Sequence, residues 1–433
     1  MKILKKMDRK ELPPMNTTAV RLYGKNDLRL ETFPLPSIQD GEILARVMSD
    51  SLCMSSYKAA KQGAAHKRVP DDVSENPVII GHEFCGEILE VGSEWQTEYQ
   101  PGDRFVIQPA MNYQGSLAAP GYSYPYIGGN ATHIIIPREV MLTGCLLPYQ
   151  GDSWYLGSLT EPLSCVVGAF HASYHVKRGS YVHEMGIREH GKMAILGGVG
   201  PMGLAAIDCI IHSERRPSLL VVTDIDAGRL ARAAELLEPE TARKNGVVLH
   251  YRDTSRADDA YRDLLNLAPE GYDDVLVFVP VKSVVELADR LLAEDGCLNF
   301  FAGPSDPDFC AEFNFFNVHY AGTHVAGNTG GNTEDMRESL DMMRRGLVDP
   351  SILVTHVGGL DSVIDTTLRL PEIPGGKKLV YTGLSMPMTA IADFEALGRT
   401  DSLFRQLHEL TQQTKGLWNG EAERYLLEHG KRL

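Results

Sequence analysis

The chain has 433 residues, 43% of them hydrophobic, and this length exceeds what one hydrophobic core usually serves, so two domains are expected. Its formal net charge of −15 excludes general binding to nucleic acids or anionic membranes, because both need a basic face. Seven scattered cysteines without paired spacing indicate a reducing, cytoplasmic compartment. No apolar run reaches the roughly 18 residues of a membrane span, and residues 1–14 lack the apolar centre of a signal peptide, so we interpret them as a disordered leader.

Residues 15–164 are predicted to form a β-rich domain. Short apolar or alternating runs stand between turn signals there, which is typical of antiparallel strands. Polar residues that carry chemistry are then expected in the loops between these strands. The runs are Ala19–Tyr23, Leu28–Glu31, Glu42–Val47, Val78–Ile80, Gly86–Val91, Asp103–Ile107 and His133–Ile136.

Residues 165–330 show a different pattern, in which strands alternate with helical stretches. The alternation predicts βαβ units and a doubly wound parallel sheet of the α/β class. Residues 331–384 are interpreted as a return to the first domain, and residues 385–433 as a helical C-terminal extension. One apolar helix face in this extension favours packing or contact between subunits of a homo-oligomer. Its residues are Leu403, Leu407 and Leu410.

One segment near the middle of the chain predicts a dinucleotide site. The apolar strand Met193–Leu196 runs into a glycine-rich turn and then a helix. In this interpretation Gly198 permits the turn, Gly200 lets the backbone approach a pyrophosphate, and Gly203 lets the helix pack closely. Because such turns are common, the decisive support is Asp224, about 20 residues later, where a carboxylate holds the adenosine ribose. The predicted contacts in the turn are Gly198, Gly200, Pro201, Met202 and Gly203.

Three further segments suit a catalytic zinc ion. His82 and Glu83 lie in a predicted loop, and Cys53 and Glu161 are flanked by turn-like residues near predicted strand ends. Cysteine, histidine and glutamate together suit zinc with one position left open. A histidine beside a carboxylate is also typical of a surface pair, and spacing alone does not assign the set.

Five short segments occur in the order found in the zinc-dependent medium-chain dehydrogenases, which this chain resembles from about residue 15 to 384. Within that superfamily, the sequences around residues 17, 53, 82 and 161 are similar to those of the L-sorbose 1-phosphate reductases. The resemblance implies a Rossmann cofactor domain, a GroES-like catalytic domain and the interconversion of L-sorbose 1-phosphate and D-glucitol 6-phosphate. The segments are Cys-x-Ser at 53, Gly-His-Glu at 81, Pro-Gly-Asp-Arg at 101, Glu-Pro-Leu at 161 and Gly-x-Gly-Pro-x-Gly at 198.

The resemblance also implies the metal ligands. Cys53, His82 and Glu161 correspond to the family's zinc ligands, and Glu83 to a neighbouring or alternating ligand. Many relatives bind a second, structural zinc ion through a cysteine-rich lobe. Residues 108–129 contain no cysteine, so one zinc ion is expected.

The same resemblance implies a proton path and a hydride carrier. Ser55 corresponds to the hydroxyl that passes the substrate proton, whereas Lys58 stands where many relatives have a relay histidine. The ketone oxygen is expected to be polarised by zinc as hydride arrives from the nicotinamide. Asp224 favours NAD(H) over NADP(H), because a carboxylate repels a 2′-phosphate. Arg229 is close enough in sequence to weaken this preference, although a solvated helix residue is its simpler interpretation.

A phosphorylated substrate needs cations, and the loop after Cys53 offers several in an otherwise acidic chain. An ordinary exposed charge run is an equal interpretation. Two other functions stay open: a dehydrogenase of unphosphorylated polyols such as sorbitol, and a protein that binds dinucleotide without turnover. The candidate phosphate contacts are Lys58, Lys61, His66, Lys67 and Arg68.

Several other polar residues are interpreted as packing residues. The cysteines in apolar runs are expected to behave as small hydrophobic residues. His356 recurs in relatives near the cofactor cleft and receives no role. The packing residues are His133, His171, His175, Cys85, Cys165, Cys209 and Cys297.

Overall fold

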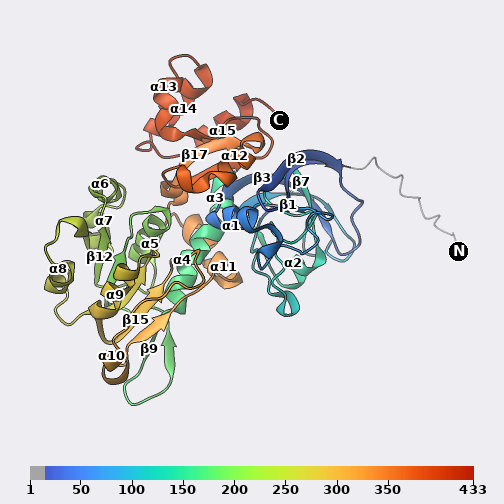
Figure 1. Cartoon of the computed structure of the whole chain (residues 1–433). Helices are drawn as coiled ribbons and strands as arrows, with labels where there is room; N and C mark the ends of the chain where they lie inside the picture. Colours follow the sequence, from blue (N-terminus) through green and yellow to red (C-terminus); the bar gives the residue numbers. More distant parts are fainter. Residues whose placement is uncertain (1–14) are drawn as a thin grey trace, which may run out of the picture.

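The computed structural model describes residues 15–433, and the leader interpreted at residues 1–14 lies outside the described residues. Figure 1 shows two sheet-based halves side by side, with a parallel sheet at the lower left and the blue strands of a mixed sheet at the right. Helices from the end of the chain lie above them. Among residues 15–433, no helix has the length and apolar character that crossing a membrane requires.

The mixed sheet has eight strands in the order β19-β17-β18-β3-β5-β6-β8, with β7 paired to β3. A three-stranded sheet, β2-β1-β4, accompanies it. The strands are β1 (Asn16–Gly24), β2 (Asp27–Pro34), β3 (Ile43–Leu52), β4 (Val78–Ile79), β5 (Phe84–Val91), β6 (Arg104–Ile107), β7 (His133–Ile136), β8 (Leu146–Pro148), β17 (Val354–Gly359), β18 (Lys377–Tyr381) and β19 (Thr389–Ala390).

The parallel sheet has six strands in the order β13-β12-β11-β14-β15-β16. The order reverses between β11 and β14, which is the switch point where doubly wound sheets bind ligands. The predicted doubly wound sheet is therefore confirmed. Its strands are β11 (Lys192–Leu196), β12 (Leu219–Asp224), β13 (Val248–Asp253), β14 (Tyr272–Val277), β15 (Leu292–Phe300) and β16 (His324–Ala326). Its helices are α5 (Pro201–His212), α6 (Ala227–Leu236), α7 (Pro239–Lys244), α8 (Ala260–Leu267), α9 (Lys282–Leu291) and α10 (Phe315–Tyr320).

The remaining elements connect or extend these sheets. The predicted boundary after residue 164 falls inside one continuous helix, α4, so the two halves share it. A hairpin of β9 (Tyr174–Val176) and β10 (His183–Met185) precedes the parallel sheet. The other helices are α1 (Met54–Gln62), α2 (Arg138–Leu142), α3 (Trp154–Ser158), α4 (Thr160–Ala172), α11 (Thr333–Arg344), α12 (Val363–Leu368), α13 (Phe394–Leu397), α14 (Ser402–Gln412) and α15 (Gly420–His429).

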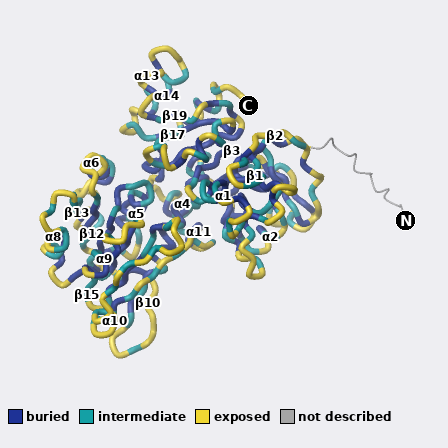
Figure 2. The backbone as a smooth tube through the Cα atoms, in the orientation of Figure 1, coloured by how far each residue is buried: buried dark blue, intermediate teal, exposed yellow. Residues whose placement is uncertain are grey.

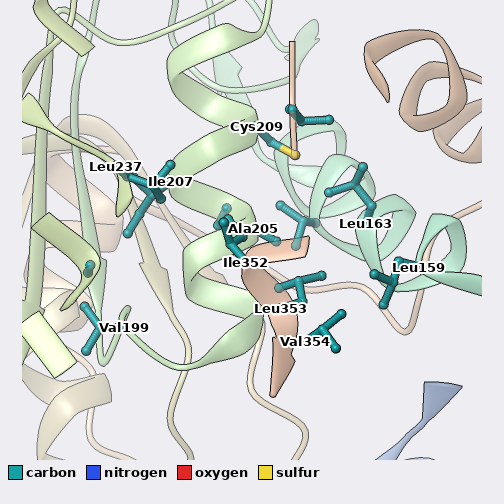
Figure 3. Packing of buried hydrophobic residues seen from close by; sticks show 14 of the residues in the cluster. Leu159, Leu163, Val199, Ala205, Ile207, Cys209, Leu237, Ile352, Leu353 and Val354 are labelled. Carbon is teal, nitrogen blue, oxygen red and sulfur yellow. The ribbon is translucent and has the colours of Figure 1, made fainter. Parts of the chain in front are cut away.

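The largest hydrophobic cluster joins the parallel sheet to the C-terminal helices. Figure 3 shows part of it, where side chains of α4, α5 and residues 352–354 meet. The same cluster continues to Tyr381 on β18 and to Trp418 and Leu426 in the extension. Figure 2 shows buried backbone running through both sheets, whereas exposed residues are frequent on α6 and α10. The C-terminal helices are therefore part of the core rather than an appended tail.

Candidate active site

Cys53, His82 and Glu83 form a compact group of possible metal ligands. Their ligand atoms all lie within 4.8 Å of one another. Cys53 follows β3 directly and caps α1, accepting a hydrogen bond from the backbone N–H of Ser55 at 3.5 Å. His82 and Glu83 lie in the short connection between β4 and β5, as predicted.

The connection that carries His82 is held by a buried polar network. Gly81 has φ +94°, and a Cβ there would lie 2.8 Å from the backbone nitrogen of Asn130, so this position requires glycine. Asp50 accepts hydrogen bonds from the backbone N–H of Glu83 at 3.2 Å and from the Asn130 side chain at 2.7 Å. The direction of the His82 and Glu83 side chains is thereby fixed by β3 and by the segment before β7.

Glu161 lies in the first turn of α4 rather than near a strand end, where we predicted it. Proline at position 162 is tolerated because the first turn of a helix leaves its N–H groups unpaired. Burial and, after it, the Glu83 carboxylate raise the pKa of Glu161 to about 8. Glu161 in turn contributes to the raised pKa of Cys53, although its carboxylate does not belong to the compact group.

Lys377, at the start of β18, is a residue of this site that sequence reasoning missed. Its ammonium donates to both carboxylate oxygens of Glu83 at 2.5 Å, and Ser51 donates to one of them. Burial alone would lower the pKa of Lys377. The attraction to Glu83, and after it to Cys53, is larger, so the pKa of the lysine is raised. The sequence around Lys377 does not indicate that this lysine is buried, because its partner Glu83 lies 294 residues away along the chain.

The chemistry of this cluster suits a divalent cation. Burial raises the pKa of Cys53 to about 12, with Glu83 adding to the effect, and burial lowers the pKa of His82 to about 4. The imidazole is therefore neutral, as a metal ligand must be, and the thiol needs a nearby cation before it ionises. A thiol, an imidazole and carboxylates form a donor set that zinc prefers.

Aromatic and basic side chains lie beside His82. The Tyr122 hydroxyl lies 3.2 Å from Nε2 of His82, and the His66 ring stacks on Tyr122 with centroids 5.7 Å apart. Burial raises the pKa of Tyr122 well above 10, and a hydrogen bond from Ser55 opposes the rise. The Arg68 guanidinium lies 5.6 Å from the centre of the same ring.

The cations predicted to contact a phosphate group point in different directions. Lys58 donates to the carbonyl of Gly303 at 3.1 Å, which links α1 to the end of the parallel sheet. Lys61 lies 5.5 Å from the ring of Tyr57 on its own helix. The charge of Arg68, by contrast, acts on the pKa values of both His82 and Glu161. Arg68 thus lies over Tyr122, whose hydroxyl contacts His82, whereas Lys67 is exposed.

A cleft of about 880 Å³ opens at the carboxyl ends of β11 and β12. The predicted turn contacts Gly200, Pro201, Met202 and Gly203 line it, together with Asp224 and Arg229 at the end of β12 and the start of α6. No heavy atom outside the adjacent backbone lies within 4 Å of a Cβ placed on Gly200, so the cleft is open there. The N-terminus of α5 faces this space, which suits a phosphate group.

The structure corrects the role assigned to Gly198. The left-handed backbone belongs to Gly197, with φ +68°, so Gly197 is the glycine that makes the turn. Gly198 is needed for packing, because a Cβ there would lie 2.6 Å from the side chain of Ile195. A Cβ on Gly203 would collide with the carbonyl oxygen of Gly198, so α5 can approach β11 only with glycine at 203.

The edge of the cleft is acidic. Asp224 accepts hydrogen bonds from the backbone N–H groups of Ile225 and Asp226 at 2.8 and 3.1 Å. Asp226 caps α6 and forms an ion pair with Arg229 at 3.5 Å. Among the described residues that line the cleft, Arg229 is the one basic side chain, and this ion pair neutralises its charge. Asp224 and Asp226 therefore place two carboxylates in the lining of the cleft.

Two residues interpreted as packing residues, Cys165 and His171, have specific partners, and His356, which received no role, lines a hollow. Cys165 donates to the Glu161 carboxylate at 3.7 Å, so it is not an inert core thiol. His171 forms an ion pair with Asp335 at 2.7 Å, which raises the pKa of the histidine to about 10. His356 lines a separate hollow of about 500 Å³ beside α12 and does not line the cofactor cleft.

Comparison with known proteins decides the family. The profile described as "Alcohol dehydrogenase GroES-like domain" matches residues 39–145, and "Zinc-binding dehydrogenase" matches residues 201–345. The L-sorbose 1-phosphate reductase of Klebsiella pneumoniae is 53% identical over 419 residues, covering 96% of this chain and 98% of that protein. The chain belongs to the zinc-dependent medium-chain dehydrogenases.

This medium-chain dehydrogenase has further relatives. The mannitol-1-phosphate 5-dehydrogenase of Aliivibrio fischeri is 48% identical over 413 residues, covering 95% of this chain and 97% of that protein. The structure of 2R,3R-butanediol dehydrogenase from Bacillus subtilis matches with a TM-score of 0.67 at 22% identity, over 84% of this chain and 99% of that one. The GroES-like and Rossmann-like architecture is thereby confirmed, and the protein is an alcohol or polyol oxidoreductase.

Proposed function

We propose that this dehydrogenase interconverts L-sorbose 1-phosphate and D-glucitol 6-phosphate, with NAD(H) as the hydride carrier and one zinc ion held by Cys53, His82 and Glu161. In reduction, a hydride from NADH and one proton add across the ketone, which gives the alcohol and NAD⁺. The observation that carries the substrate class is the guanidinium of Arg68, which lies over the ring of Tyr122 next to His82 and has no ion-pair partner among residues 15–433.

The donor set supports the metal part of the proposal. When bound, zinc supplies a Lewis acid that stabilises the negative charge developing on the substrate oxygen. Glu83 is paired with Lys377 and Ser51, so we assign it to holding the cluster together rather than to a fourth ligand position. A position is then left open for the substrate.

Arg68 supports a phosphorylated substrate. A planar guanidinium can donate two parallel hydrogen bonds to a phosphate group, and such bonds are among the strongest in proteins. In a chain of net charge −15, a cation left free of carboxylates at an active site attracts an anionic ligand. Lys58 is the second candidate, because its contact with the Gly303 carbonyl places its ammonium between the two halves.

The proton and the nucleotide are assigned to other residues. We propose that Ser55, two residues after Cys53, delivers the proton to the substrate oxygen, and that Lys58 lies at the outer end of this path. The two carboxylates at the end of β12 support NAD(H), because a 2′-phosphate placed there would be repelled by Asp224 and Asp226.

The test compares phosphorylated and free ketose. NADH oxidation is followed with L-sorbose 1-phosphate and with L-sorbose, using the wild-type enzyme, Arg68→Ala and the control Lys61→Ala, and zinc is measured in each sample. The loss of Arg68 should raise the KM for the phosphorylated ketose by about 10- to 100-fold, the value of one or two charge-assisted hydrogen bonds. The KM for L-sorbose should not change, and Lys61→Ala should resemble the wild type.

Two results would contradict the proposal. Equal turnover of both ketoses by the wild type would favour a dehydrogenase of unphosphorylated polyols. An equal effect of Arg68→Ala on both substrates would show that this side chain does not contact the phosphate group.

A further inference from the structure

The N-terminus of helix α3 is capped by Glu423, a residue of the C-terminal extension. Glu423 accepts hydrogen bonds from the backbone N–H groups of Trp154 and Tyr155, each at 2.7 Å, one with each carboxylate oxygen. These are the first two residues of α3, whose N–H groups have no partner within the helix. Ser153, the residue in the capping position, makes no capping bond with its side chain. Glu423 takes over a function that a local serine usually performs.

The carboxylate of Glu423 is itself held in place. The Tyr381 hydroxyl donates to it at 2.9 Å, and the Trp418 indole donates to the Tyr381 hydroxyl at 2.7 Å. Glu423 is 3% exposed, and the Tyr381 and Trp418 side chains are fully buried. A buried carboxylate with three donors has little freedom, so the position of α15 and the position of α3 are coupled.

The other end of the contact reaches the strands that carry the metal ligands. The carbonyl of Trp154 accepts hydrogen bonds from Cys85 at 2.9 Å and from Ser49 at 3.3 Å. Ser49 belongs to β3, which ends just before Cys53, and Cys85 belongs to β5, which follows Glu83. α3 is therefore clamped between the C-terminal extension on one side and β3 and β5 on the other.

Helix α3 leads directly into the helix that carries Glu161. A single residue, Leu159, separates α3 from α4, and its N–H bonds to the carbonyl of Tyr155 at 3.1 Å. The N–H of Leu163 bonds in turn to the carbonyl of Leu159 at 3.2 Å, so the hydrogen-bonded backbone is continuous from α3 into the first turn of α4. A displacement of α3 would therefore move the Glu161 side chain relative to Cys53 and His82.

We propose that Glu423 is a positioning residue of the metal site, because its carboxylate fixes α3 and thereby sets where Glu161 meets Cys53 and His82. The inference rests on the proposed function, since Glu161 is a proposed zinc ligand. It assigns a role to the C-terminal extension that reaches beyond packing: residues 385–433 hold one ligand of the active site in place from outside it.

The experiment measures zinc affinity directly. The zinc dissociation constants of the wild-type enzyme, Glu423→Gln and Glu421→Gln are determined by competition with a chelator of known affinity, on samples whose NADH binding by calorimetry shows an intact cofactor cleft. Glu421 is the matched control, because it lies on the same helix turn and is exposed. Glutamine keeps the shape of residue 423 but offers one strong acceptor where the carboxylate offers two.

The expected result is a rise of at least about tenfold in the zinc dissociation constant of Glu423→Gln, similar to the effect of removing a group that orients a metal ligand. Glu421→Gln should match the wild type. If Glu423→Gln does not fold, Glu423→Asp, which withdraws the carboxylate by one methylene group, is judged by the same criterion.

The outcomes separate the two proposals. Zinc binding by the wild type with unchanged affinity in the folded Glu423 variant would overturn the positioning role alone. A wild-type enzyme that binds no zinc would overturn the proposed function as well.

Discussion

The cofactor cleft and the metal-ligand cluster are built in opposite ways. The cleft comes from three short stretches, residues 197–203, 224–229 and 278–279, at the ends of neighbouring parallel strands. The cluster and the charged residues around it come from four distant places, with Cys53 after β3, His82 before β5, Glu161 on α4 and Lys377 on β18. A locally built site depends on its own turn, whereas an assembled site depends on every element that brings its members together.

This difference predicts which perturbations each site will feel. Changes in the mixed sheet or the C-terminal extension should weaken the metal cluster and leave NADH binding intact. Changes at the end of β12 should alter nucleotide choice and leave the metal cluster intact. The following variants test this separation, beginning with the largest expected effect.

Cys53→Ser should remove zinc binding and lower kcat/KM by roughly 10³-fold or more, because a thiolate ligand is lost and zinc chemistry supplies several kcal/mol. The affinity for NADH, measured by calorimetry, should stay within about twofold of the wild-type value. Cys310→Ser is the control, since Cys310 is an exposed free cysteine. A Cys53→Ser enzyme that keeps its zinc and its rate would show that the cluster is not the metal site.

Lys377→Met should destabilise the protein by about 3–5 kcal/mol, because it leaves the buried carboxylate of Glu83 without its counter-ion. Urea unfolding of the metal-free protein measures this change. Adding Glu83→Gln should recover much of the lost stability, since the neutral amide needs no cation. If the double variant is as unstable as Lys377→Met, the lysine stabilises the fold through contacts other than this ion pair.

Asp224→Ser should raise the ratio of kcat/KM for NADPH to that for NADH by about tenfold, because one of the two carboxylates facing the ribose is removed. The zinc content should not change. Asp258→Ser, an exposed acid in the parallel-sheet half, provides the control. An unchanged ratio would mean that Asp224, held by the N–H groups of its own turn, does not face the ribose.

The same contrast explains what the sequence could reveal. The parallel sheet, the glycine-rich turn and Asp224 were predictable because periodicity and spacing are local signals. The assignment of the turn to Gly198 was wrong: Gly197 has the left-handed backbone, whereas Gly198 is needed for packing against Ile195. The helical extension was predicted, but not its contact with α3.

The metal cluster was predictable only through resemblance, and its surroundings were not predictable from sequence patterns. Glu161 was expected near a strand end, although the proline that follows it is a sign of a helix start. Lys377 and Glu423 carry no local signal, because each acts on a partner hundreds of residues away along the chain. Long-range pairing of buried charges is information that only the folded chain contains.

The contact between α3 and α15 can be followed by the intrinsic fluorescence of the protein. The chain has three tryptophans, and two of them, Trp154 and Trp418, belong to the network around Glu423. Trp154 lies under the guanidinium of Arg104 at 4.3 Å, and Trp418 is sealed in the core. Intrinsic fluorescence therefore reports mainly on the contact between α3 and α15. Separation of residues 385–433 from α3 can be followed in the native enzyme without a dye or a label.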